Sequence, residues 1–247
     1  MSPRPTFLEA AINGARERGD HPELPLTPAE QARAAAACRA QGADAVHAHV
    51  RDAEGRETLA ADAVASLVRA LRAAAPGLPT GISTGAWIEP DPRTRVAQVR
   101  GWSERPDFAS VNFDEVGALE VADALLAMGV GIEAGLASAA AAETFVASGI
   151  AARCLRVLLE PQDQTVPAAL AATAAMEQVL TRAGVAIPRL LHGTGATAWA
   201  LLAEAVRRGH QARIGLEDTL LLPDGRVAPD NAALVVAARR LLARPPC

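Results

Sequence analysis

The stretch Asp44-Ala-Val-His-Ala-His-Val-Arg-Asp52 is a short apolar run that ends in two histidines and is followed at once by charged side chains. Alternate side chains of a β-strand point to the same face, so His47 and His49 can direct two imidazole nitrogens toward one point. Two ligands reach one metal ion in this way. Hydrogen-bonded core histidines are the alternative interpretation, and the rest of the sequence decides between the two.

A helix-start signal precedes this stretch. The first apolar run, residues 6–13, is followed by Thr27-Pro-Ala-Glu30, in which Thr27 can cap a helix, Pro28 suits its first position and Glu30 completes a capping box. We therefore expect a helix from there to about Gln41, ended by Gly42. The His-x-His strand, residues 44–50, follows directly.

The same alternation of a short apolar run and a helical segment continues to the end of the chain. Further strands are expected over residues 79–84, 107–112, 130–134, 154–160, 189–192 and 212–216. Further helices are expected over residues 60–75, 93–102, 117–128, 138–147, 167–182, 196–208 and 230–242. Eight strand-then-helix units in 247 residues match an α/β fold of the (β/α)8 TIM-barrel type, whose usual length is about 250 residues.

Residues 1–247 are predicted to form a single TIM-barrel domain, because no low-complexity tract or charge block separates the halves. A doubly wound open sheet is the main rival, and it requires a glycine-rich phosphate turn after an early strand. Asn13-Gly14 instead opens a polar loop, and His192-Gly-Thr-Gly195 is an isolated Gly-x-Gly. The barrel is therefore favoured.

The charge balance argues against two classes of partner. The 24 basic and 28 acidic residues give a formal net charge of -4, without the basic excess typical of proteins that bind nucleic acid or anionic membranes. Residues 1–6 contain no apolar signal-peptide core, and no apolar run approaches the ~18 residues that span a bilayer. The three cysteines show no metal-binding spacing, so reduced thiols are expected. We expect a cytoplasmic homo-oligomer whose partners are small molecules.

Polar side chains are concentrated where the predicted strands end, and in a TIM barrel these ends carry the catalytic groups. Packing alone does not explain this clustering, because the strands otherwise consist mainly of Ala, Val, Ile and Leu. In strand order the residues are Asn13 and Arg16; His47, His49, Arg51 and Asp52; Ser83; Ser110 and Asn112; Glu133; Glu160; His192; and Arg213, Glu217 and Asp218.

Glu217 is the expected third metal ligand. Arg213, Gly215 and Glu217 share one face of the eighth strand if that strand reaches so far, and even-numbered strands contribute to the same layers of barrel side chains. Two histidines and one carboxylate leave a fourth position open, which is the catalytic pattern for zinc. The alternative for Glu217 is a salt bridge to Arg51 or Arg213. His192 competes as a ligand, and we rank it as a supporting or substrate-contacting residue.

The motifs together resemble the β-keto acid cleavage enzymes, whose type member is the 3-keto-5-aminohexanoate cleavage enzyme. The resemblance covers nearly the whole chain, and its most specific parts are His-x-His-x-Arg-Asp and Arg-x-Gly-x-Glu-Asp. The segments that carry it are Asn13-Gly14, Leu24-Pro-Leu-Thr-Pro-Ala-Glu30, His47-Ala-His-Val-Arg-Asp52 with Gly55-Arg56, Ser83-Thr-Gly85, Ser110-Val-Asn112 and Arg213-Ile-Gly-Leu-Glu-Asp218.

The resemblance implies a zinc-dependent barrel that converts a β-keto acid and acetyl-CoA to acetoacetate and a new acyl-CoA. It implies one zinc ion per chain on His47, His49 and Glu217, with Asp218 as the general base working with Arg213. Ser83, Ser110 and Glu133 fall where the family places further active-site groups, and Ser110 replaces a threonine while keeping the hydroxyl. Predicted substrate contacts are Asn13, Arg16, Ser110, Asn112 and His192.

Arg16 departs from the family pattern, in which enzymes acting on an amino-bearing keto acid have an acidic residue at this place. A guanidinium there favours a neutral polar or anionic distal group on the substrate. Arg16 would not face the substrate if it paired with Glu17, Asp20 or Glu23. The chain also stops soon after the eighth helix, at Arg244-Pro-Pro-Cys247, which leaves open any oligomer contact made by a longer tail.

Two other functions are compatible with the same residues. The first is a zinc-dependent barrel hydrolase of an amide or lactone, although such barrels commonly place His-x-His on the first strand and use more histidines. The second is a metal-bound barrel that binds a keto acid without converting it. Formation of acetoacetate that requires acetyl-CoA separates the three possibilities.

Overall fold

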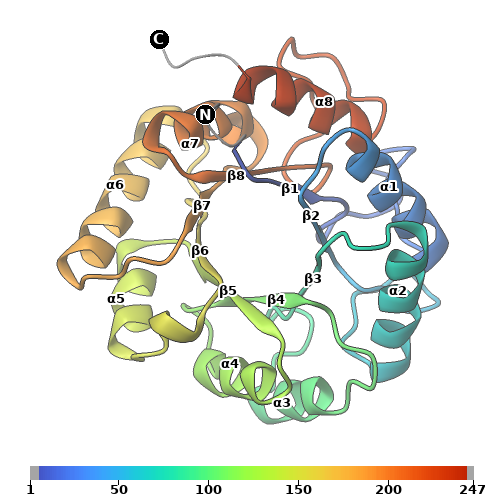
Figure 1. The fold of residues 1–247 in the computed structure, drawn as a ribbon, viewed down its shortest axis with the longest axis horizontal. Helices are drawn as coiled ribbons and strands as arrows, with labels where there is room; N and C mark the ends of the chain where they lie inside the picture. Colours follow the sequence, from blue (N-terminus) through green and yellow to red (C-terminus); the bar gives the residue numbers. More distant parts are fainter. Residues whose placement is uncertain (1–5, 244–247) are drawn as a thin grey trace.

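A computed structural model describes residues 6–243, and in it eight parallel strands close into a barrel in chain order, β1 to β8 (Figure 1). The predicted TIM barrel is confirmed. Expectations that concern residues 1–5 and the Arg244–Cys247 tail lie outside the described range. The strands are β1 (Leu8–Ala11), β2 (Ala45–Ala48), β3 (Thr80–Ser83), β4 (Phe108–Asn112), β5 (Gly131–Leu136), β6 (Arg156–Leu159), β7 (Arg189–Leu191) and β8 (Gln211–Ile214).

The helices form an outer ring around the strands (Figure 1). The largest apolar cluster joins the barrel strands to the inner faces of these helices. The helices are α1 (Pro28–Ala40), α2 (Ala61–Ala74), α3 (Pro92–Arg100), α4 (Ala118–Ala127), α5 (Ala139–Ala147), α6 (Val166–Arg182), α7 (Ala198–Arg208) and α8 (Asn231–Leu242), with 3-10 turns η1 (Ala151–Arg153) and η2 (Gly195–Thr197).

The predicted capping box starts α1. The hydroxyl of Thr27 accepts the backbone N–H of Glu30 at 3.3 Å, and the Glu30 carboxylate accepts the backbone N–H of Thr27 at 2.9 Å. The hydrogen bond from Thr27 is the largest cause that lowers the pKa of Glu30, to about 2. Local sequence therefore fixes where the chain turns from the first loop into the first helix.

Charged side chains lie inside the barrel as well as at its mouth. Arg156 packs its guanidinium 4.2 Å from the centre of the Phe7 ring, and its Nε lies 3.3 Å from Oε1 of Glu133. Glu133 and Glu9 are both fully buried. Gly81 leaves room for the Phe108 ring, because a Cβ at Gly81 would lie 1.9 Å from that ring.

The end of β8 differs from the expectation for an extended strand. β8 stops at Ile214, and the chain then turns, with the N–H groups of Asp218 and Thr219 both donating to the carbonyl of Gly215. Glu217 therefore reaches the barrel mouth from a turn and not from strand alternation. β2 is also short, and His49 lies just beyond its last residue, Ala48.

Among residues 6–243, no helix combines the length and the apolar character required to cross a lipid bilayer.

We predict that Gly215→Ala destabilises the protein. A Cβ at Gly215 would lie 1.8 Å from the backbone oxygen of Ala11 in β1, and neither backbone can move without breaking the β1–β8 pairing. The expected cost is about 2–3 kcal/mol, which lowers Tm by about 5–10 °C in a chain of this size. Gly19→Ala is the control, because nothing lies within 4 Å of its added Cβ. Equal Tm values for both variants in thermal denaturation would contradict the assigned close approach.

Candidate functional site

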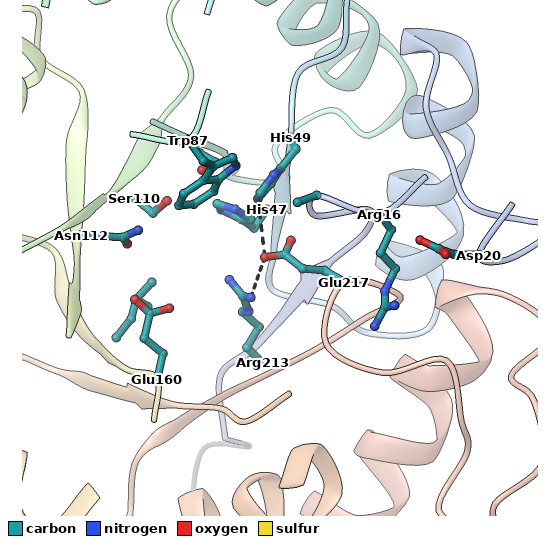
Figure 2. Close-up of a pocket in the computed structure, with 13 residues that line it drawn as sticks. Arg16, Asp20, His47, His49, Trp87, Ser110, Asn112, Glu160, Arg213 and Glu217 are labelled. Carbon is teal, nitrogen blue, oxygen red and sulfur yellow. Dashed lines mark hydrogen bonds and ion pairs between the residues drawn. The ribbon is translucent and has the colours of Figure 1, made fainter. Parts of the chain in front are cut away.

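Three predicted metal ligands meet at the C-terminal mouth of the barrel (Figure 2). His47, His49 and Glu217 each offer one ligand atom, and these atoms lie within 4.8 Å of one another. The two imidazole rings are 5.4 Å apart between centroids and nearly perpendicular. His47 is 1% exposed and His49 is 4% exposed, so the two imidazoles are largely shielded from bulk water.

Glu217 is placed by the turn after β8 and by the loop after β1. Its backbone N–H donates to the carbonyl of Ala11 at 3.2 Å. Gly14 leaves the space that the Glu217 side chain occupies, since a Cβ at Gly14 would lie 2.5 Å from Glu217 Cγ. Gly14 also has a φ of 58°, which disfavours any residue with a side chain.

Arg213 holds two neighbouring carboxylates. Its Nη2 lies 2.7 Å from Oε1 of Glu217 and 2.8 Å from Oδ1 of Asp218. Burial alone would raise the pKa of both carboxylates, but the Arg213 guanidinium lowers the pKa of Asp218 and keeps that of Glu217 well below its usual range. The ion pair expected as the alternative for Glu217 is therefore present, and it occupies only one carboxylate oxygen. The other oxygen, Oε2, is buried without a hydrogen-bond partner among the described residues.

Glu57 and Trp87 support His49 from the side opposite Glu217. His49 Nδ1 lies 2.5 Å from Oε1 of Glu57, which leaves Nε2 directed toward Glu217 Oε1 at 3.5 Å. Trp87 stacks on the His49 ring with centroids 6.0 Å apart, and its indole N–H donates to the same Glu57 carboxylate. A carboxylate on the second nitrogen is the usual support of a metal-binding histidine. Glu57 lies outside all of the sequence motifs quoted above.

The two histidines hold protons differently. Burial is the largest cause that lowers the pKa of His47 to about 3, so its imidazole is neutral at neutral pH. Burial acts in the same direction on His49, but the Glu217 and Glu57 carboxylates outweigh it and raise the pKa of His49 to about 9. One imidazole is therefore ready to bind a metal ion, and the other must first lose a proton.

A cavity of about 420 Å³ opens beside the cluster. Its volume lies within the range typical of small-molecule sites, roughly 300–1,000 Å³. Eight predicted site residues line it together with five others. The predicted ones are Arg16, His47, His49, Ser83, Ser110, Asn112, Arg213 and Glu217, and the remaining lining residues are Ala15, Asp20, Trp87, Leu158 and Glu160.

Asn13 and Glu133 are buried behind the cavity wall. Asn13 donates from Nδ2 to the His49 carbonyl at 2.9 Å and accepts the His49 N–H at 2.8 Å, so it anchors the backbone of a metal-ligand candidate. Glu133 lies in the barrel interior, where burial and then the Glu9 carboxylate raise its pKa well above the usual range. Glu9, His47 and Glu133 also bring ligand atoms within 4.8 Å of one another.

Asp218 and His192 also lie behind the cavity wall. Asp218 is fully buried, and its Oδ1 is 3.5 Å from His192 Nδ1. The other ring nitrogen of His192, Nε2, is 3.4 Å from Oε2 of Glu160. Burial lowers the pKa of His192, but its contacts with Asp218 and Glu160 outweigh burial and raise it. The structure thus brings His192 next to the predicted base and away from the metal-ligand cluster.

The fold and these contacts define a class of protein: a TIM barrel with a candidate metal centre of two histidines and one carboxylate at the catalytic end of the barrel. The chain belongs to the beta-keto acid cleavage enzyme family, because the sequence model of that family matches residues 5–145 and 140–245. The family predicted from the sequence motifs is confirmed.

One relative and several solved structures are similar to parts of the chain. A 3-oxoadipate:acetyl-CoA acetyltransferase of Cupriavidus necator is 34% identical over 111 residues, which are 44% of this chain and 37% of that relative. The apo structure of ObcA has a TM-score of 0.72 at 17% identity, covering 89% of this chain and 61% of that chain. Tryptophan synthase subunit alpha of Legionella pneumophila has a TM-score of 0.58 at 14% identity, covering 96% and 92%. These two structural similarities show the fold alone.

The difference in pKa between His47 and His49 predicts proton release on metal binding. Metal ions bind neutral imidazole, so between the pKa of His47, about 3, and that of His49, about 9, an ion that enters the cluster displaces about one proton, from His49, and none from His47. Apparent affinity should therefore rise about tenfold per pH unit until the pH reaches the pKa of His49. Calorimetric titration with zinc in buffers of different ionisation enthalpy counts the protons. Release of none at neutral pH would contradict a protonated His49.

Proposed function

We propose that this chain is a zinc-dependent β-keto acid cleavage enzyme, an acyltransferase that converts a β-keto acid and acetyl-CoA to acetoacetate and an acyl-CoA by Claisen and retro-Claisen chemistry. The observation that carries the proposal is the convergence of His47, His49 and Glu217 beside a cavity lined by Arg213 and Ser83. Family membership and the name of the Cupriavidus necator relative support the reaction class.

The donor set fits zinc. Two imidazoles and a carboxylate are the ligands of a catalytic zinc site, which keeps a further position open. Glu217 Oε2 is buried without a partner among residues 6–243, and Glu57 orients His49 through its second nitrogen. A bound zinc ion supplies Lewis acidity, which stabilises the negative charge that develops when a carbon–carbon bond next to a ketone forms or breaks.

The residues of the cavity wall supply groups for a carboxylate-bearing substrate. The guanidinium of Arg213 is only 5% exposed and offers a fixed positive charge next to the cluster. Ser83 and Ser110 provide hydroxyl groups, and Ser83 Oγ already accepts the N–H of Gly85, which leaves its own O–H free to donate. We assign these side chains to holding the β-keto acid in place.

Asp218 is assigned to general-base catalysis together with Arg213. The Arg213 Nη2 atom lies 2.8 Å from the Asp218 carboxylate, which keeps that carboxylate ionised. Burial raises the pKa of Asp218 and so opposes the effect of the Arg213 cation. Because Asp218 is fully buried and does not line the cavity, it acts on a substrate proton only through neighbouring side chains.

The charge of Arg16 favours a substrate with an anionic or neutral polar distal group. Its Nε donates to the Leu216 carbonyl at 2.5 Å, and among residues 6–243 it forms no ion pair with Glu17, Asp20 or Glu23. Its charge is therefore not neutralised by these carboxylates at the rim of the cavity, where Arg16 and Asp20 both contribute to the lining (Figure 2). The relative's name refers to 3-oxoadipate, a β-keto acid with a second carboxylate, which agrees with this preference.

The function is tested with a panel of β-keto acids, each incubated with the zinc-loaded protein with and without acetyl-CoA. We expect acetoacetate only when acetyl-CoA is present. His47→Ala and Glu217→Ala should lose both the product and the bound zinc, measured by elemental analysis, because each leaves too few ligands. His210→Ala is the control, since His210 contacts Glu177 outside the cavity. Hydrolysis of the β-keto acid without acetyl-CoA and without acetoacetate would indicate a hydrolase, and binding without conversion would indicate a keto-acid receptor.

Arg16→Glu should shift the substrate preference toward amino-bearing β-keto acids. In the wild type we expect kcat/KM to be higher for an anionic β-keto acid than for an amino-bearing one of equal length, because like charges brought together at a partly dry site cost several kcal/mol. The charge reversal should change the ratio of the two kcat/KM values by about tenfold or more, which corresponds to ~1.4 kcal/mol. Arg18→Glu is the matched control in the same loop, where Arg18 pairs with Glu30. An unchanged ratio at normal zinc content would remove Arg16 from substrate recognition.

A further inference from the structure

Glu160 is an acidic side chain of the cavity to which the proposed mechanism gives no role. It follows β6, its side chain is 16% exposed, and it lines the same cavity as His47, His49 and Glu217. Figure 2 shows Glu160 and Glu217 on the two sides of Arg213. Gly135 of β5 makes room for it, since a Cβ there would lie 2.5 Å from Glu160 Oε1.

The Glu160 carboxylate is free to accept a proton from a ligand. Among residues 6–243 its only ionic partner is His192, which contacts Oε2 at 3.4 Å. The amide of the neighbouring Asn112 donates to Glu115 at 3.0 Å, and no hydrogen bond joins it to Glu160. Oε1 therefore remains available on the cavity side.

His192 joins Glu160 to Asp218. Its two ring nitrogens lie 3.4 Å from Glu160 and 3.5 Å from Asp218, and the ring is only 2% exposed. At these distances neither ring nitrogen forms a hydrogen bond with any described residue, and catalytic contacts of this kind commonly shorten when a substrate is bound. An imidazolium at this place donates to both carboxylates at once.

We propose that Glu160 is a further catalytic residue, the cavity-facing carboxylate that exchanges a proton with carbon 2 of the β-keto acid, and that His192 is a positioning residue linking it to Asp218. The inference rests on the proposed function for the identity of the substrate. It gives the fully buried Asp218 an indirect part in the step, because Asp218 contacts the His192 ring that positions Glu160.

The proton step is balanced without another reactant. The C–H bond at carbon 2 breaks, its electron pair stays on the substrate as the enolate, and the proton bonds to an Oε atom of Glu160. After the acyl group has been exchanged, the same proton returns to carbon 2 of the acetoacetate enolate. His192 keeps its N–H groups on Glu160 and Asp218 throughout, so the reaction consumes no proton overall.

The test is hydrogen–deuterium exchange at carbon 2 of 3-oxoadipate in D2O, followed by proton NMR with the zinc-loaded full chain and no acetyl-CoA, after subtraction of the rate without protein. Glu160→Gln should lower the exchange rate by about 100-fold or more, the usual contribution of a positioned general base, while zinc content and Tm stay unchanged. Glu160→Asp keeps a carboxylate and should restore part of the rate. His192→Asn should lower the rate without changing zinc content.

Asp163→Asn is the matched control, because Asp163 is an exposed acidic residue of the same loop that does not line the cavity. Exchange by Glu160→Gln within about threefold of the wild type, or no exchange by the zinc-loaded wild type, would overturn the proposal. Acetoacetate formation is measured separately. Wild-type exchange without acetoacetate formation would refute the proposed function and leave the role of Glu160 standing, whereas acetoacetate formation with unimpaired exchange in Glu160→Gln would do the reverse.

Discussion

One guanidinium organises the mouth of this barrel. Arg213 is 5% exposed, and it contacts the carboxylates of Glu217 and Asp218 at 2.7 and 2.8 Å. Removing one partner of a buried ion pair leaves an uncompensated charge and costs about 3–5 kcal/mol. Arg213 favours the charged form of both carboxylates, the proposed zinc ligand and the proposed base.

The barrel backbone holds these charged side chains in a fixed arrangement. Strand β1 lies between β2 and β8, so the segments that carry His47 and Arg213 are both hydrogen-bonded to it. Glycines at positions 14 and 215 permit the close approaches that bring Glu217 toward the histidines. Asn13 adds two hydrogen bonds to the backbone of His49. Such support before any ligand arrives is the main way in which a protein raises the effectiveness of a polar site.

The fold and the core of the site could be predicted from local patterns, and the supporting residues could not. Apolar runs alternating with capped helical segments indicate strands and helices, and His47 and His49 share a strand face by simple periodicity. Glu57 supports His49 from eight positions further along the chain, through a bridge between Arg51 and Glu57 that no periodicity signals. The pairing of Glu9 with Glu133 depends on distances across the barrel, which the sequence does not encode locally.

The placement of Glu217 also could not be predicted from sequence periodicity. The sequence predicts it as the third ligand through an extended strand, but β8 ends at Ile214 and a turn places the residue. The family motif points to the same three residues because it records the result of the turn and not its geometry. The Glu160–His192–Asp218 arrangement combines residues from three strand ends, so it becomes visible only when the barrel closes.

Crystallographic anomalous scattering at the zinc edge, measured on the zinc-loaded protein, tests the central claim most directly. The account predicts one peak per chain within about 2.0–2.2 Å of a nitrogen of His47, a nitrogen of His49 and an oxygen of Glu217. A peak between Glu9, His47 and Glu133, or no peak near the barrel mouth, would contradict it.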